Sequence, residues 1–347
     1  MIRRNDGNDW LLIAQADHAR LAADIARVWG NDDVPSLPLP DQLVAAIRDH
    51  DDGWREWEQS PEIDPATGGP RDFTEMPMSA ATRIWSKSIF ASACGDPSHA
   101  AALHRYRQFL DSRQQQFTLE RAMVLDAVLS IRHGFQMEEL LDELPRITGS
   151  TAVNRPAVSR TVSQLRDAGV IREGIDGSME PAVKRVGSSP LGGIWVSRHF
   201  CWLAEKARES RTDMPDDLDA IERFLGEQAE LQQKWTDQGV REFAGEELPR
   251  LIETGYRYMQ FFDRISLWLC CAENPQPTEM TLPGSEPIRL IPHSRGTIVV
   301  DPFALEVESL ELSVDARRIS ARRYDHDQLQ QAIAAAPAER LRWTLRR

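Results

Sequence analysis

The sequence lacks any apolar run long enough to cross a membrane. The apolar segment near the N-terminus, Trp10 to Ala14, is soon interrupted by polar residues, whereas a membrane helix needs roughly 18 to 20 consecutive apolar residues. The same segment is too short for a signal peptide. We therefore expect a cytoplasmic protein with no membrane partner.

Cysteine is scarce, with four residues in 347, at Cys94, Cys201, Cys270 and Cys271. Apolar residues flank them, and no pair has the C-x-x-C spacing that is typical of zinc knuckles and redox motifs. The pattern favours buried free thiols over disulfides.

Positive charge is also in deficit. The chain has 41 Lys and Arg against 54 Asp and Glu, a formal net charge of -13. Such a balance argues against a protein whose whole surface binds nucleic acid, although one segment can still carry a basic face. The remaining composition, 41% hydrophobic and 27% charged, is that of a globular chain with two or three domains.

Two histidines fall on the inward faces of the first two predicted helices. In the helix predicted over 15–29, His18 shares a stripe with the apolar residues one turn later. The helix predicted from Asp41 ends its own apolar stripe at His50, and Asp51 follows. Both histidines are therefore expected to point toward the interior.

A third histidine and a second acid lie late in the chain, His199 on a helix predicted over 195–208 and Asp263 on one over 247–271. A single histidine on an apolar face is usually a hydrogen-bonded core residue, and a buried carboxylate is costly without a cation or donors. Together, imidazole and carboxylate groups from separate helices suit Mn, Fe, Zn or Mg. We predict a site for a divalent ion formed by His18, His50, Asp51, His199 and Asp263.

The segment 98–187 has a different pattern. Predicted helices are followed by a further helix from Asn154 to Gly169 and by a hairpin over 171–186 centred on Asp176-Gly177, an order typical of winged helix-turn-helix modules. The segment has 12 Lys or Arg against 11 Asp or Glu, a net of +1, so the rest of the chain carries -14. Docking of protein or a structural role therefore stays open beside DNA binding, for which the expected contacts are Arg155, Ser159, Arg160 and Gln164.

This segment resembles the DNA-binding half of the ferric uptake regulator family. His133-Gly134-Phe135-Gln136-Met137-Glu138-Glu139-Leu140 is similar to that family's H-F-x-x-E-E-L pattern, and 154–171 is similar to its recognition helix. Ser159 stands where the family has tyrosine, and the metal-sensing dimerisation half is missing. The resemblance implies DNA binding without that family's metal-dependent dimerisation.

The rest of the chain resembles the HD superfamily of metal-dependent phosphohydrolases in its order of a first-helix His, a His-Asp pair and a late Asp. More closely, 1–97 joined to 188–347 resembles the domain of unknown function (DUF) 3891 family in its pieces Q-x-D-H-A-R-L-A, H-D-D-G-W, S-R-H-F and D-x-x-S-L. The resemblance to this family implies the fold more firmly than any reaction. The resemblance to the HD superfamily implies hydrolysis of a phosphorylated or nucleotide-like small molecule by metal-activated water. Asp52 would orient the water, His199 would bind a second ion or donate a proton, and Arg83, Lys87 or Arg198 would neutralise the anionic substrate.

We therefore predict a mainly α fold. It comprises an HD-like helical bundle (1–97 with 188–275), an inserted winged helix (98–187) and a small β-rich C-terminal region (276–347), with the loop 56–77 as a lid over the site. A metal- or ligand-responsive DNA-binding transcriptional regulator is the competing function, and a metal-stabilised scaffold without chemistry is a third. The sequence leaves the oligomeric state open.

Overall fold

The computed structural model describes residues 1–94, 99–130, 135–148, 154–174, 178–181, 189–239, 247–282, 286–294 and 296–347. The chain divides into two compact units, one formed by Met1–Cys94 with Gly187–Arg347 and the other by Gly95–Val186. Residues 95–98, where the predicted insert begins, lie outside the described residues.

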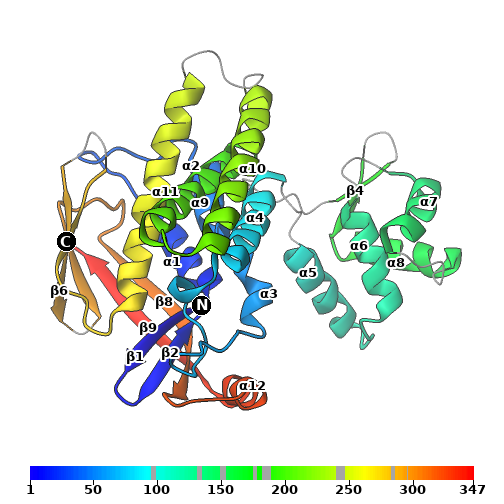
Figure 1. Ribbon diagram of the computed structural model, residues 1–347. Helices are drawn as coiled ribbons and strands as arrows, with labels where there is room; N and C mark the ends of the chain where they lie inside the picture. The colour runs from blue at the N-terminus through cyan, green and yellow to red at the C-terminus, as the bar shows by residue number, and fades with distance from the viewer. Residues whose placement is uncertain are drawn as a thin grey trace. The chain divides into compact units, whose positions relative to one another are not determined.

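The first unit combines long helices with a sheet (Figure 1). Its helices are α1 (Gln15–Arg27), α2 (Pro40–Asp49), α3 (Trp54–Glu58), the 3-10 turn η1 (Phe73–Glu75), α4 (Met78–Cys94), α9 (Pro190–Ser210), α10 (Pro215–Gly239), α11 (Glu247–Cys271) and α12 (His326–Ala335). Its strands are β1 (Ile2–Asp6), β2 (Asp9–Ile13), β5 (Thr278–Met280), β6 (Ile288–Ser294), β7 (Thr297–Asp301), β8 (Ser309–Ser320) and β9 (Ala338–Arg346).

These strands form one seven-stranded sheet in the order β1-β2-β8-β9-β7-β6-β5. Neighbours are antiparallel, except that β7 and β9 are parallel. The pairing of β2 with β8 places Ile13 opposite Ala316. The sheet therefore contains both β1, near the N-terminus, and β9, near the C-terminus.

This sheet corrects the predicted fold class. The mainly α, HD-like helical bundle with a separate β-rich C-terminal region is wrong, because a mixed seven-stranded sheet curled into a half-barrel accompanies the helices. The C-terminal strands share this sheet with the N-terminal strands β1 and β2. The expectation failed because Ile2–Asp6, with the sequence IRRND, has too few apolar residues to indicate a strand by itself.

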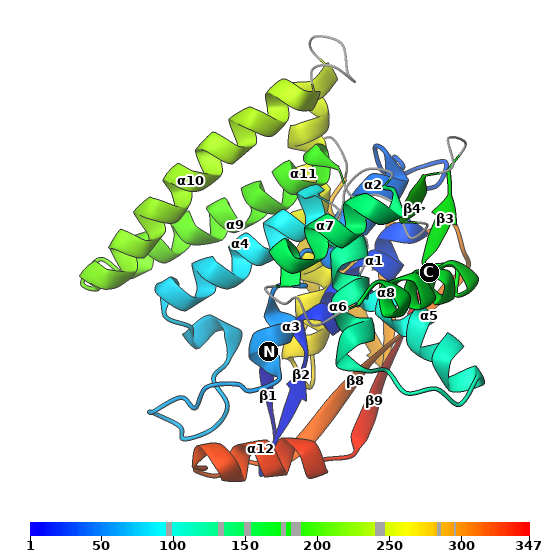
Figure 2. The same ribbon diagram turned by 90° about the vertical axis from the view of Figure 1, so that its right-hand side faces the viewer.

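Helices cover both faces of the sheet. On one face α1 and α11 pack together, and α1 also contacts α2 and β8. On the other, Leu329 of α12 is buried with Trp10 and Leu12 of β2, and Figure 2 shows α12 beside the ends of β8 and β9. Helices α4, α9 and α10 lie side by side. The inward stripe of α1 is thereby enclosed between sheet and helices, which is where His18 lies.

The predicted lid loop is bound to the sheet. Arg3 of β1 donates to the backbone oxygen of Pro70 (2.7 Å) and to Glu75 (2.6 Å). The backbone N–H of Tyr324 donates to the oxygen of Gly68 (2.8 Å). The loop is thus an ordered cover of β1 and of the chain before α12.

The second unit contains α5 (His99–Ser112), α6 (Leu119–Ser130), α7 (Met137–Thr148), α8 (Arg155–Asp167) and the antiparallel strands β3 (Ile171–Glu173) and β4 (Met179–Pro181). It has its own apolar core, which includes Tyr106, Leu125, Phe135, Leu140 and Leu165. The predicted hairpin centre, Asp176-Gly177, lies outside the described residues, and the winged-helix assignment stays a prediction.

Two smaller expectations can be compared with the structure. Cys201, Cys270 and Cys271 are free thiols, but only Cys270 is buried, and Cys271 is exposed. The side chain of Cys94 lies outside the described residues. Across the described ranges, no helix has both the length and the apolar character that spanning a membrane requires.

Candidate metal centre

The structure brings all five predicted metal ligands together in the first unit. His18 comes from α1, His50 and Asp51 from the end of α2, His199 from α9 and Asp263 from α11. All five are at most 6% exposed. We call this set the His/Asp cluster. It contains two groups of ligand atoms that lie within 4.8 Å of one another, which are His18, His50 and Asp51, and His50, His199 and Asp263.

The end of α2 directs two neighbouring residues into the cluster. His50 is the C-cap of α2 with helical backbone angles, and the turn continues because the N–H of Trp54 donates to the oxygen of Asp51 (3.1 Å). Gly53 lets this turn approach α4, since a Cβ there would lie 2.2 Å from the backbone oxygen of Ile84. Close packing against α4 therefore fixes the position of the His50-Asp51 pair.

Two of the distances between nitrogen and oxygen atoms in the cluster, both made by His50, suit a shared cation. Nε2 of His50 lies 3.4 Å from Oδ2 of Asp51 and 3.3 Å from Oδ1 of Asp263, and Nε2 of His18 lies 2.7 Å from Oδ2 of Asp51. Nε2 of His199 is 3.8 Å from Oδ2 of Asp263. Two ligands bound to one ion at about 2.1 Å lie about 3.0 to 3.4 Å apart in octahedral or tetrahedral geometry. The contacts of His50 fall within this range.

One buried ring nitrogen gives a second test of this fit. Nδ1 of His50 donates to the backbone oxygen of Ile47 (2.7 Å), so Nε2 is the ring atom that a metal would take in place of a proton. That Nε2 is buried without a hydrogen-bond partner. Nδ1 of His199 also has no partner, although Nε2 is the atom of that ring nearest to Asp263. Because a buried polar atom without a partner is costly, the donor set fits a bound divalent ion.

In this buried cluster the histidines and the carboxylates shift one another's pKa values. Burial lowers the pKa of His50, but the carboxylates of Asp51 and Asp263 outweigh this effect and raise the pKa to about 10. Burial raises the pKa of each carboxyl group, yet the histidines hold both pKa values below their ordinary range. For His199, burial dominates and the pKa is lowered. Two carboxylates therefore stay charged and attract a cation.

Asp52 was predicted to orient the attacking water. Asp52 follows the cluster in sequence, and its carboxylate accepts from Nε of Arg55 (2.9 Å). Its role in orienting water stays a prediction.

Two of the three basic residues predicted to bind the anionic substrate are paired with acidic residues. Lys87 pairs with Glu56, and Arg198 pairs with Glu253 at 3.0 Å. Arg83 is exposed on α4. Two of the three would have to leave an acidic partner in order to bind a phosphate.

The four predicted DNA contacts all lie on α8 in the second unit. Ser159 and Arg160 are exposed. Arg155 pairs with Glu138, and Gln164 accepts from the hydroxyl of Tyr106 (2.9 Å) and donates to Gln115 (2.9 Å). Gln164 is thus occupied within the unit.

Sequence reasoning assigned no role to Ser266, a fully buried neighbour of the cluster on α11. Its Oγ lies 3.0 Å from Nδ1 of His18. The available signal was its position one helical turn after Asp263, which places both residues on the same face.

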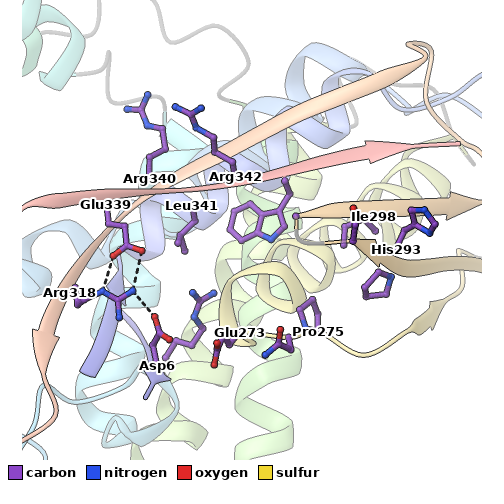
Figure 3. Close-up of a pocket in the computed structure, with 16 residues that line it drawn as sticks. Asp6, Glu273, Pro275, His293, Ile298, Arg318, Glu339, Arg340, Leu341 and Arg342 are labelled. Atoms are coloured by element: carbon purple, nitrogen blue, oxygen red, sulfur yellow. Dashed lines mark hydrogen bonds and ion pairs between the residues drawn. The ribbon is translucent and has the colours of Figure 1, made fainter. Parts of the chain in front are cut away.

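A cavity of about 780 Å³ lies elsewhere in the first unit, lined by residues of β1, of the sheet and of the chain after α11. Figure 3 shows Arg318 between Glu339 and Asp6, with Arg340 on the other side of β9 from Leu341. Arg318 bonds Glu339 at 2.9 Å and Asp6 at 2.6 Å. Arg318 is thus paired with two carboxylates. No residue of the His/Asp cluster lines the cavity.

One family model matches most of the chain. The model of the family described as "Protein of unknown function (DUF3891)" matches residues 1–133 and 182–321, ranges that contain the whole His/Asp cluster. Residues 134–181, inside the second unit, are not matched. Searches of curated proteins and of solved structures found no match. Because the match covers most of its length, the chain belongs to the DUF3891 family.

Proposed function

We propose that this protein is a metal-dependent hydrolase that acts on a phosphorylated or nucleotide-like small molecule. The observation that carries the proposal is the convergence of three histidines and two aspartates, from helical segments far apart in sequence, on one buried point. Their order along the chain also resembles that of the HD superfamily. A structural role alone would not explain why two ring nitrogens, Nε2 of His50 and Nδ1 of His199, have no hydrogen-bond partner in the protein.

Four residues are proposed to hold the ion, namely His18, His50, Asp51 and Asp263. When bound, a divalent ion supplies Lewis-acid chemistry, which lowers the pKa of water and polarises a phosphoryl oxygen. The side chains of Asp51 and Asp263 are more exposed than those of the histidines. We propose that water and substrate approach from the side of these two carboxylates.

His199 is proposed to bind a second ion or to donate a proton to the leaving group. Burial lowers its pKa, so the ring is neutral near pH 7, with one nitrogen protonated and the other able to accept or bind metal. Asp52 is proposed to orient the attacking water.

Turnover by defined metal forms tests the proposal. Protein stripped with a chelator and reloaded with Mn, Fe, Zn or Mg is assayed on a generic phosphodiester and a panel of nucleotides. We expect turnover that needs the ion and falls at least 100-fold in Asp51→Asn. The exposed histidine variant His293→Gln is the control and should keep full activity. Tight metal binding without turnover on any substrate would instead support the scaffold.

A DNA-binding regulator is the second candidate, favoured by the exposed residues of α8. Ser159, Arg160, Ser163 and Arg166 are all exposed, and arginine on such a helix can contact phosphates or guanine. This function would use the second unit, with the His/Asp cluster as a sensor.

Retention on random duplex DNA tests this candidate. Binding should weaken steeply as salt rises, because phosphate contacts release counterions, and Arg160→Ala should reduce it. Glu173→Gln, which removes an exposed acid of the same unit, should not reduce it. No retention at low salt would rule this function out.

A further inference from the structure

Ser266 joins α1 to α11 beside the proposed metal ligands. It is fully buried, and its Oγ lies 3.0 Å from Nδ1 of His18 and 2.9 Å from the backbone oxygen of Asp263. Both lengths are typical of hydrogen bonds. One hydroxyl therefore makes two contacts at once.

The protons in these contacts can be assigned. A serine hydroxyl has one proton to donate. The carbonyl oxygen of Asp263 can only accept, so the hydroxyl of Ser266 donates to it. The contact with His18 is then a hydrogen bond only if Nδ1 of the ring donates and Oγ accepts.

This assignment decides which atom of His18 faces the cluster as a ligand. With the proton on Nδ1, Nε2 is the ring atom that can bind a metal. Nε2 lies on the cluster side, 2.7 Å from Oδ2 of Asp51, to which it donates when no ion is present. A bound ion would take the place of that proton. The same arrangement holds at His50, whose Nδ1 donates to the oxygen of Ile47.

We propose that Ser266 is a positioning residue that holds His18 with a proton on Nδ1 and thereby presents Nε2 to the metal. The inference rests on the proposed metal centre. It gives a role to the serine of the D-x-x-S-L piece, which the ligand set does not use. Outer partners of this kind fix ring orientation, and their loss commonly costs 10- to 100-fold in metal affinity.

Zinc affinity, measured by competition with a chelator, tests the proposal. Ser266→Ala removes the acceptor and should weaken Zn²⁺ binding by about 10- to 100-fold. Ser266→Thr keeps a hydroxyl that can bond the preceding turn of the helix and should restore affinity to within about threefold.

Ser197→Ala is the matched control for loss of a buried hydroxyl. Ser197 is also fully buried in a helix, but it bonds Gln228 and Gln232 of α10. A merely structural role for Ser266 would lower the thermal stability of both alanine variants and leave zinc affinity unchanged in both.

Nitrogen-15 NMR of the metal-free protein gives a second readout that needs no metal. The ring signals of His18 are identified by their loss in His18→Gln. We expect a protonated Nδ1 in the wild type, and a changed Nδ1 signal in Ser266→Ala.

The outcomes separate the two proposals. Unchanged zinc affinity in Ser266→Ala, or an unprotonated Nδ1 in the wild type, would overturn the role of Ser266. Failure of the wild type to bind zinc or any other divalent ion would overturn the proposed function, and the Nδ1 signal alone would then decide whether Ser266 sets the protonation of His18.

Discussion

Nε2 of His50 lies 3.3 Å from Oδ1 of Asp263, although more than half of the chain separates the two residues. His50 belongs to both groups of metal-binding side chains, one with His18 and Asp51 and one with His199 and Asp263. Each group loses a member if this ring is removed. The proposed centre therefore depends on His50 more than on any other of its residues.

Replacement of His50 by glutamine should abolish metal binding. The amide has no imidazole lone pair, and we expect at least a 100-fold loss of Mn²⁺ or Zn²⁺ affinity, measured by equilibrium dialysis. His293→Gln changes an exposed histidine of β6 and should bind like the wild type. Equal affinity in both variants would place the ion elsewhere.

Metal should stabilise the folded protein, because the ligands converge only in the folded chain. Binding at 100 times the dissociation constant adds about 2.7 kcal/mol to the free energy of unfolding. We expect calorimetry to show a higher Tm with Zn²⁺, reversed by a chelator. The prediction fails if the Tm of the wild type shifts no more than that of His50→Gln.

The metal-free protein should lose stability as the pH rises. The pKa of His50 is 6.5 in an unperturbed chain and about 10 in the folded protein, so the folded state keeps a proton that the unfolded state has released. The free energy of unfolding should therefore fall between about pH 6.5 and about pH 10. Urea titrations from pH 7 to pH 9.5 measure this slope, which His50→Gln should flatten. A wild-type stability that is flat or rises over this interval contradicts the assignment.

Gly53→Ala should disturb the turn that holds His50 and Asp51. An added Cβ would lie 2.2 Å from the backbone oxygen of Ile84, and such overpacking costs about 1–3 kcal/mol. Gly226→Ala is the matched control, since a Cβ in α10 meets nothing within 4 Å. It should be neutral or slightly stabilising, because alanine favours helix. Urea unfolding compares the two, and equal stability would show that the turn accommodates a side chain.

The members of the His/Asp cluster could be predicted because each leaves a local mark in the sequence. His18 and His199 interrupt apolar stripes at helical spacing, and Asp263 sits within a strongly apolar helix. Periodicity reports the side of a helix on which a residue lies. It does not report hydrogen-bond partners, so the contact of Ser266 with His18 could not be anticipated.

The sheet could not be predicted in the same way. β2 pairs with β8, whose residues lie near the opposite end of the chain, and pairing over such a separation leaves no pattern in either segment. β8 runs without a break from Ser309 to Ser320. Asp315 and Arg317 interrupt the apolar pattern, yet both fit an exposed face of one long strand.

Anomalous scattering from a crystal containing Mn²⁺ or Zn²⁺ tests the central claim most directly. The account predicts a peak bound by His18, His50, Asp51 and Asp263, with distances of about 2.0 to 2.2 Å from the ion to nitrogen and oxygen. The peak should be absent in His50→Gln crystals grown in the same way. A fully loaded crystal with no peak among these residues, or with its ion bound elsewhere, would contradict the account.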